Sequence, residues 1–91
     1  MLMLDISIDK EYKLAYVKTG AGAFGRTIFV NDEINVDLDS NGAIIGVEFL
    51  SFEILSHKVE YVDSNGSELG PKITVAITEA QKEVKARLTS E

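Results

Sequence analysis

The chain has 91 residues, no cysteine and a formal net charge of −6 at pH 7. This length supports one domain with a core of modest size, and the lack of cysteine excludes disulfides, thiolate nucleophiles and cysteine-ligated zinc. No apolar run reaches the length of a membrane span and the first residues lack the pattern of a secretory signal, so we expect a cytoplasmic protein that does not enter membranes.

The negative charge is concentrated in the middle of the chain. Between residues 31 and 68 the sequence has nine aspartates and glutamates and a single base, Lys58. Such a segment repels nucleic-acid phosphates, which predicts that the chain alone binds neither DNA nor RNA. A basic protein partner or a cation is its natural complement, and an acidic surface that serves only solubility is the plain alternative.

Alternating residues predict a β-hairpin at the start of the chain. Residues 4–8 form its first strand, a polar turn follows, and residues 13–18 return as the second strand. A glycine-rich connection over 19–25 then leads into residues 26–30, whose β-branched and aromatic side chains predict another strand. Residues 31–33 interrupt it as a tight turn or a bulge.

Residues 34–49 predict a second hairpin, closed by Asn41 and Gly42. Asn-Gly is the pair that best tolerates the positive φ angles of a type I′ turn. Folding the chain about this turn brings the apolar residues of both strands onto one face, so turn and alternation agree. The paired positions in this register are Ser40 with Ala43, Leu38 with Ile45, Val36 with Val47, and Ile34 with Phe49.

The elements after this hairpin are less regular. Residues 50–55 are apolar on both alternating phases, which fits a strand buried on both faces, a bulge or one short helical turn. Residues 58–62 predict a strand that ends in the turn at 63–66, where the Asp-Ser-Asn-Gly of residues 39–42 recurs. Gly70 and Pro71 then mark a boundary.

The last twenty residues combine two patterns. Residues 73–78 alternate as a strand would, and their β-branched side chains favour a strand. Thr78 and Gln81 match a capping box, which predicts a short helix over 79–88 with acids early and bases late. The sequence therefore predicts an α+β fold, an antiparallel sheet built as a meander of hairpins with a short C-terminal helix, as a single domain over residues 1–91. Residues on one helical stripe are Ile73, Ile77, Ala80, Val84 and Leu88.

One motif points to a cation. Residues 37–48 match the string of an EF-hand calcium loop, Asp-x-Asp-x-Asn-Gly followed by a glutamate. Both flanks alternate as strands, so the helices that an EF-hand needs are missing and the hairpin is the better interpretation. A looser site formed by Asp37, Asp39 and Glu48 stays open, since neighbouring carboxylates repel one another less when they share a cation.

Two further features resemble functional motifs and are better explained by structure. Residues 20–25 spell the dinucleotide-binding Gly-x-Gly-x-x-Gly, but a strand and not a helix is predicted after them. His57 is the only histidine, which leaves nucleophilic and zinc chemistry without partners, so we expect it on the surface. We therefore predict no catalytic residue, no cofactor and no enzymatic activity.

The first half of the chain also carries an ordered set of short motifs. They are Ile6-Ser-Ile-Asp9, Glu11, Leu14-Ala-Tyr-Val17, Gly25-Arg-Thr27, Val30-Asn-Asp-Glu33, Val36-Asp-Leu-Asp39 and the segment from Asn41 to Leu50. In this order they resemble the domain of unknown function 2283 family of small bacterial and phage proteins. The chain departs from that pattern at Lys10, where the family turn carries proline, and in the glycine-rich spacer before Arg26.

The resemblance implies a compact antiparallel β-fold over residues 1–50, with residues 51–91 as an extension. It implies no established activity, and members beside toxin genes suggest an antitoxin-like role. We therefore expect a small acidic protein that binds another protein through a sheet edge or its acidic face. The alternatives are a structural homo-oligomer of a bacterial or phage assembly, which would supplement the small core, and a weak cation-binding module.

Overall fold

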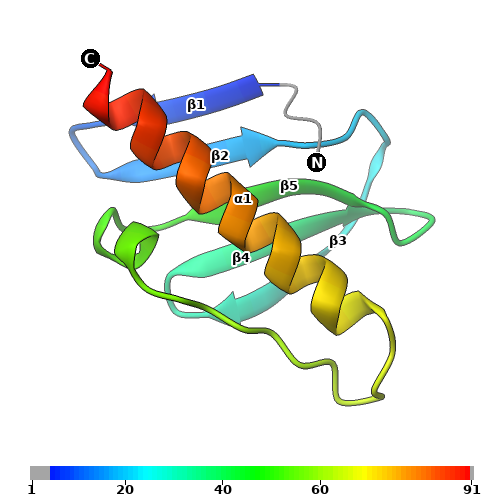
Figure 1. Cartoon of the computed structure of the whole chain (residues 1–91). Helices are drawn as coiled ribbons and strands as arrows, with labels where there is room; N and C mark the ends of the chain where they lie inside the picture. The colour runs from blue at the N-terminus through cyan, green and yellow to red at the C-terminus, as the bar shows by residue number, and fades with distance from the viewer. Residues whose placement is uncertain (1–4, 91) are drawn as a thin grey trace.

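The computed structural model describes residues 5–90 and contains a five-stranded antiparallel sheet crossed on one face by a C-terminal helix (Figure 1). The strand order is β1-β2-β5-β4-β3, so the opening hairpin lies beside the last strand of a three-stranded meander. This confirms the predicted α+β class and antiparallel sheet. The elements are β1 (Asp5–Asp9), β2 (Leu14–Lys18), β3 (Phe24–Asn31), β4 (Ile34–Asp39), β5 (Ile44–Phe49), the 3₁₀ turn η1 (Glu53–Ser56) and α1 (Leu69–Thr89).

The five predicted strands of the first half are confirmed, although Leu4 lies outside the described residues. Residues 31–33 form the tight turn, in which the Glu33 amide donates a hydrogen bond to the Asn31 side chain at 2.8 Å. Of the three interpretations of residues 50–55, the short helical turn is observed as η1, and it buries Ile54 and Leu55.

The predicted register of the central hairpin is confirmed away from its turn and wrong at the turn. Val36 pairs with Val47 and Ile34 with Phe49 as expected, but Leu38 pairs with Ile44 because β4 and β5 shift by one residue between Asp37 and Leu38. The turn is not type I′: Gly42 has a φ of +87°, whereas Asn41 keeps a negative φ. The Gly42 amide donates a hydrogen bond to the Asp39 carbonyl. The loop is wider than a two-residue turn, and the shift of register between Asp37 and Leu38 accommodates the additional residue.

Cross-strand rows of apolar side chains give the sheet one covered face, which packs against α1. The long rows follow from the register and the period of two along each strand. Together with the buried face of α1 they form the core. One row is Ile6, Val17, Val47, Val36 and Ile28, and the other is Ile8, Ala15, Phe49 and Ile34.

The prediction of a strand over residues 58–62 is wrong. Residues 57–63, which we call the strap, run extended beside α1 and pair with no strand (Figure 1). Side chains of the helix take the place of a strand partner. Gln81 donates hydrogen bonds from Nε2 to the carbonyls of Ile54 and His57, both at 2.8 Å, and the Thr74 hydroxyl accepts one from the Tyr61 amide at 2.9 Å.

The prediction of a strand over residues 73–78 is also wrong, because the helix already begins at Leu69. Gly70 and Pro71 lie inside its first turn, where proline lacks only an amide that has no helical partner. Ile73 and Ile77 are fully buried on the predicted helical stripe, and this burial outweighs the weak helix propensity of β-branched residues. Thr78 does not cap a helix, since its hydroxyl donates to the Thr74 carbonyl one turn earlier at 3.0 Å.

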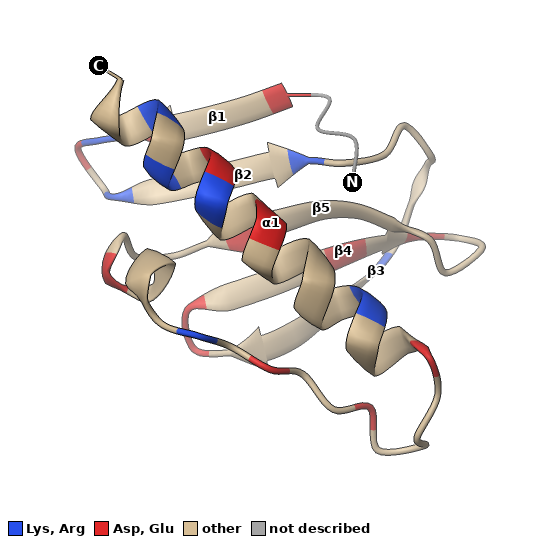
Figure 2. Cartoon of the chain, in the orientation of Figure 1, with Lys and Arg blue, Asp and Glu red and all other residues tan. Residues whose placement is uncertain are grey.

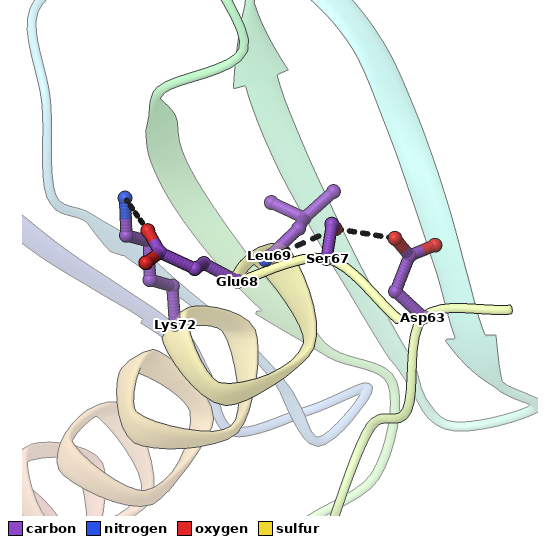
Figure 3. A network of polar contacts seen from close by, with 5 residues as sticks. All are labelled: Asp63, Ser67, Glu68, Leu69 and Lys72. Atoms are coloured by element: carbon purple, nitrogen blue, oxygen red, sulfur yellow. Dashed lines mark hydrogen bonds and ion pairs between the residues drawn. The ribbon is translucent and has the colours of Figure 1, made fainter. Parts of the chain in front are cut away.

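The turn at residues 63–66 leads directly into α1 and is observed as predicted, with Gly66 at a φ of +67°. In the close view of Figure 3, the Ser67 hydroxyl donates a hydrogen bond to the Asp63 carboxylate, and the Leu69 amide donates to the Ser67 hydroxyl at 3.2 Å. The hydrogen bond from Ser67 lowers the pKa of Asp63. Ser67 thus satisfies one of the amides at the helix start.

Candidate functional site

The face of the sheet opposite α1, which we call the open face, carries polar side chains where the covered face carries aliphatic ones. The two central strands β4 and β5 contribute acids and no base, whereas α1 carries both signs of charge (Figure 2). The register arranges the open face in two cross-strand rows. One row is Ser7, Tyr16, Glu48, Asn35 and Phe29, and the other is Asp5, Lys18, Gly46, Asp37 and Thr27.

Asp37 lies at the centre of a hydrogen-bond network on this face. Its Oδ2 accepts a hydrogen bond from the Tyr16 hydroxyl at 2.9 Å, and its Oδ1 accepts one from the Thr27 hydroxyl at 2.7 Å. These donors come from β2 and β3, on either side of the β4–β5 pair. The carboxylate is therefore held in one orientation on a partly buried surface, where hydrogen bonds to a charged group are strong.

Gly46 makes the contact between Tyr16 and Asp37 sterically allowed. It lies in β5 between the strands of these two residues, and the tyrosine ring leans across it. A Cβ atom at position 46 would overlap the Tyr16 hydroxyl oxygen and the adjacent ring carbon. Any side chain here would displace the phenol, so the glycine is needed for close approach.

The same surroundings change the acidity of Tyr16. Its pKa rises from 10.0 to about 12, first because burial disfavours the phenolate, then because of the hydrogen bond to Asp37 and the negative charges of Asp37 and Glu48. Tyr16 therefore remains a neutral donor throughout the physiological range.

Two more acids of the candidate cation site have protein donors. Glu48 accepts a hydrogen bond from the Asn35 side chain at 3.0 Å. Asp39 accepts two from the amides of Asn41 and Ala43, both at 2.9 Å, and so closes the hairpin turn. Within residues 5–90 the structure contains no group of three or more acidic or histidine side chains arranged to hold a metal ion. The cation site of Asp37, Asp39 and Glu48 stays a prediction from sequence.

The two other sequence motifs and His57 lie in structural positions. The EF-hand string, residues 37–48, covers the end of β4, the hairpin turn and most of β5, so it is flanked by strands and not by helices. The Gly-x-Gly-x-x-Gly string leads into β3, and Gly22 and Gly25 pack so closely on Asp39 that a Cβ at either would overlap it. These glycines therefore serve contact with the hairpin turn. His57 is exposed, as predicted, and its carbonyl is bound by Gln81.

The sequence did not point to Tyr16, Thr27, Asn35 and Gly46 as members of this site. Asn35 and Gly46 could be placed on the acidic side of the predicted hairpin. Tyr16 and Thr27 become neighbours of Asp37 only once β2 is known to pair with β5 and β3 with β4. No local pattern contains the first of these pairings, because β2 and β5 are far apart in sequence.

The two edges of the sheet differ in chemistry. β1 is short and begins and ends with aspartate, the kind of charged edge that disfavours pairing with another chain. β3 has eight residues, no acid and no proline, and Arg26 is its single charge. Two of its aromatic side chains are largely exposed, Phe24 at 62% and Phe29 at 76%. The pairing of β3 with β4 is irregular between Phe24 and Arg26 and between Phe29 and Asn31, so the regular part of this edge that is open to strand addition is residues 26–29.

No family model, curated protein or solved structure in the three comparisons matches the chain. The resemblance to the domain of unknown function 2283 family thus stays an expectation from the residues. In the described part of the chain, no helix combines the length and apolarity required to cross a bilayer.

Proposed function

We propose that this chain is a small protein-binding module that adds an extended, basic segment of a partner to the β3 edge, beside the acids of the open face. The observation that carries the proposal is the combination of an edge strand without acid or proline and the oriented carboxylate of Asp37 on the neighbouring strand. Strand addition supplies affinity through backbone hydrogen bonds, and the side chains that alternate along the added strand supply specificity.

The backbone of β3 supports this mode of binding. β3 is the last strand in the sheet order, so β4 is its single neighbouring strand and its other edge is unpaired in the sheet. Within residues 5–90, the backbone hydrogen bonds outside the helices and strands include none to β3. An edge of this kind offers unpaired amides and carbonyls to another strand.

The rows of the open face specify the chemistry of the partner. An added strand would place one side chain beside Thr27, in the row that contains Asp37. Neighbouring strands lie about 4.8 Å apart, so a lysine or arginine at that position would start about 10 Å from the Asp37 backbone and could reach its carboxylate. The side chain placed beside Phe29 would lie against an exposed aromatic ring, which favours an apolar or aromatic residue.

Selection from a random peptide library tests this proposal. We expect enrichment of peptides that alternate lysine or arginine with apolar residues, with binding that weakens as salt is added because the contact is partly electrostatic. Phe29→Asp should lower the affinity for the selected peptides by about tenfold or more, because the aromatic contact is lost and a charge is introduced at the edge.

Val62→Asp is the matched control, since Val62 is an equally exposed apolar residue that lies on the strap. It should leave peptide affinity unchanged. Enrichment of acidic peptides, or equal loss of binding in both variants, would contradict the proposal. If the partner is a toxin, as the family resemblance suggests, co-expression with this chain should restore growth and Phe29→Asp should abolish the rescue.

A homo-oligomer is the second candidate, and the same edge favours it. An unprotected β3 can pair with β3 of a second copy and so extend the sheet across a two-fold axis. Sedimentation equilibrium distinguishes the two candidates. A dimer that Phe29→Asp dissociates assigns the edge to self-association, whereas a monomer at all concentrations reserves it for another protein.

A further inference from the structure

A groove lies on the other side of the molecule, between the first turns of α1 and the end of the β4–β5 hairpin. Its volume is about 600 Å³, which is within the range of sites for small molecules. The walls are largely apolar and include Ile44, Leu69, Pro71, Val75 and Ala76. Val75 is 55% exposed although Ile73 and Ile77, on the same helix, are fully buried, so part of the apolar wall faces solvent.

One charge borders this apolar groove. Among the residues that line it, Lys72 is the one ionised side chain. Its Nζ lies 4.0 Å from the Glu68 carboxylate, and both side chains are well exposed, at 69% and 91% (Figure 3). An exposed ion pair at this distance contributes little to stability. The Lys72 ammonium group can therefore leave Glu68 and pair with another anion at a small cost in free energy.

The start of α1 adds to the positive potential at the same place. The helix has 21 residues and no acid in its first turn, and Leu69 and Pro71 of that turn line the groove. The positive end of the helix dipole and Lys72 therefore act in the same direction. The rim of the groove thus favours an anion, although the chain as a whole carries a net charge of −6.

We propose that this groove binds a small amphipathic anion, a molecule with an apolar body and one carboxylate. The body lies against Ile44, Val75 and Ala76, and the carboxylate pairs with Lys72. The inference does not depend on the proposed protein-binding function, because the groove shares no residue with the β3 edge or with the two rows of the open face.

Titration with decanoate, followed by amide chemical shifts below the concentration at which decanoate forms micelles, tests the proposal. We expect saturable shifts at Ile44, Val75 and Ala76, and an affinity about tenfold higher than that of decanol, which has the same chain without the charge. In Lys72→Gln the affinity for decanoate should fall to that of decanol.

Two variants make the result specific to the groove. Lys82→Gln removes an exposed lysine elsewhere on α1 and should leave the affinity for decanoate unchanged. Val75→Asp should abolish binding of both probes, because it places a charge in the apolar wall. The proposal is overturned by shifts that do not saturate, by shifts confined to the open face, by equal affinities for the two probes or by full decanoate affinity in Lys72→Gln. A peptide that saturates the groove while decanoate does not would overturn it as well.

Discussion

At the scale of single residues, the open face depends on the absence of a side chain at Gly46. Tyr16 reaches Asp37 only by crossing the backbone of β5 at this position, and the hydrogen bond between them is 2.9 Å long. Thr27 holds the other carboxylate oxygen at 2.7 Å. The orientation of an acid on β4 is thus determined by residues of three other strands, and the proposed binding of a basic segment would use a carboxylate that is already held in place.

Gly46→Ala should destabilise the protein by about 1 to 3 kcal/mol, the usual cost of inserting a methyl group where there is no room. The new Cβ would overlap the Tyr16 hydroxyl and push the ring off Asp37. Urea unfolding measures the loss. In a Tyr16→Ala background the same substitution should cost much less, because the clashing ring is gone; an undiminished cost there would place the strain elsewhere.

Gly46→Ala should also lower the pKa of Tyr16 from about 12 towards 10.0, since the phenol loses its burial and its carboxylate acceptor. In the native protein the raised pKa means that the folded state favours the protonated phenol. Its stabilising contribution is fully present below pH 10 and is lost as the pH rises through about 12. Tyrosinate absorbance, taken as the difference between each protein and its Tyr16→Phe form, reports this titration.

At the scale of elements, α1 acts on the strap as well as on the sheet. Gln81 is the buried polar residue among those described, and its amide nitrogen donates to two carbonyls that have no strand partner. The Thr74 hydroxyl accepts a hydrogen bond from the Tyr61 amide, further along the strap. Two side chains of the helix therefore replace the ladder that a sheet would provide for this extended segment.

Gln81→Leu should destabilise the protein by about 1 to 3 kcal/mol, because the His57 carbonyl loses the Gln81 donor while the Ile54 carbonyl keeps the hydrogen bond from the His57 amide. Hydrogen exchange should also become faster in the strap than in β4 and β5, because only the strap loses its attachment. Unfolding and exchange measurements on one sample separate the two effects. Lys82→Leu, at the exposed neighbouring position, is the control; comparable loss in both variants would argue against the role of the amide.

At the scale of the whole molecule, one helix covers the apolar face of the sheet. Ile73, Ile77, Ala80 and Val84 are fully buried along it, against rows contributed by every strand. A domain of this size buries a limited fraction of its surface and has a small margin of stability. We therefore expect the fold to require the helix, even though the sheet alone contains all the residues of the open face.

Ile77→Ala should destabilise the protein by about 2 to 5 kcal/mol, through lost transfer energy and the cavity that remains. This is a large share of the 5 to 15 kcal/mol typical of a domain. Thermal and urea unfolding give the value, with Thr78→Ala at the next, exposed position as the control. A loss below about 1 kcal/mol for Ile77→Ala would mean that the helix is not needed to cover the sheet.

The sequence by itself determined the hairpins, because a turn signal and an alternation of period two act between residues that are close along the chain. Val36 and Val47, like Ile34 and Phe49, pair as their pattern predicts. Tertiary structure alone decided three other features: the pairing of β2 with β5, the helical state of residues 73–78 and the attachment of the strap to Gln81 and Thr74. In each case the deciding energy comes from burial or hydrogen bonds between segments distant in sequence, and these contacts outweigh the local preference of β-branched residues for a strand.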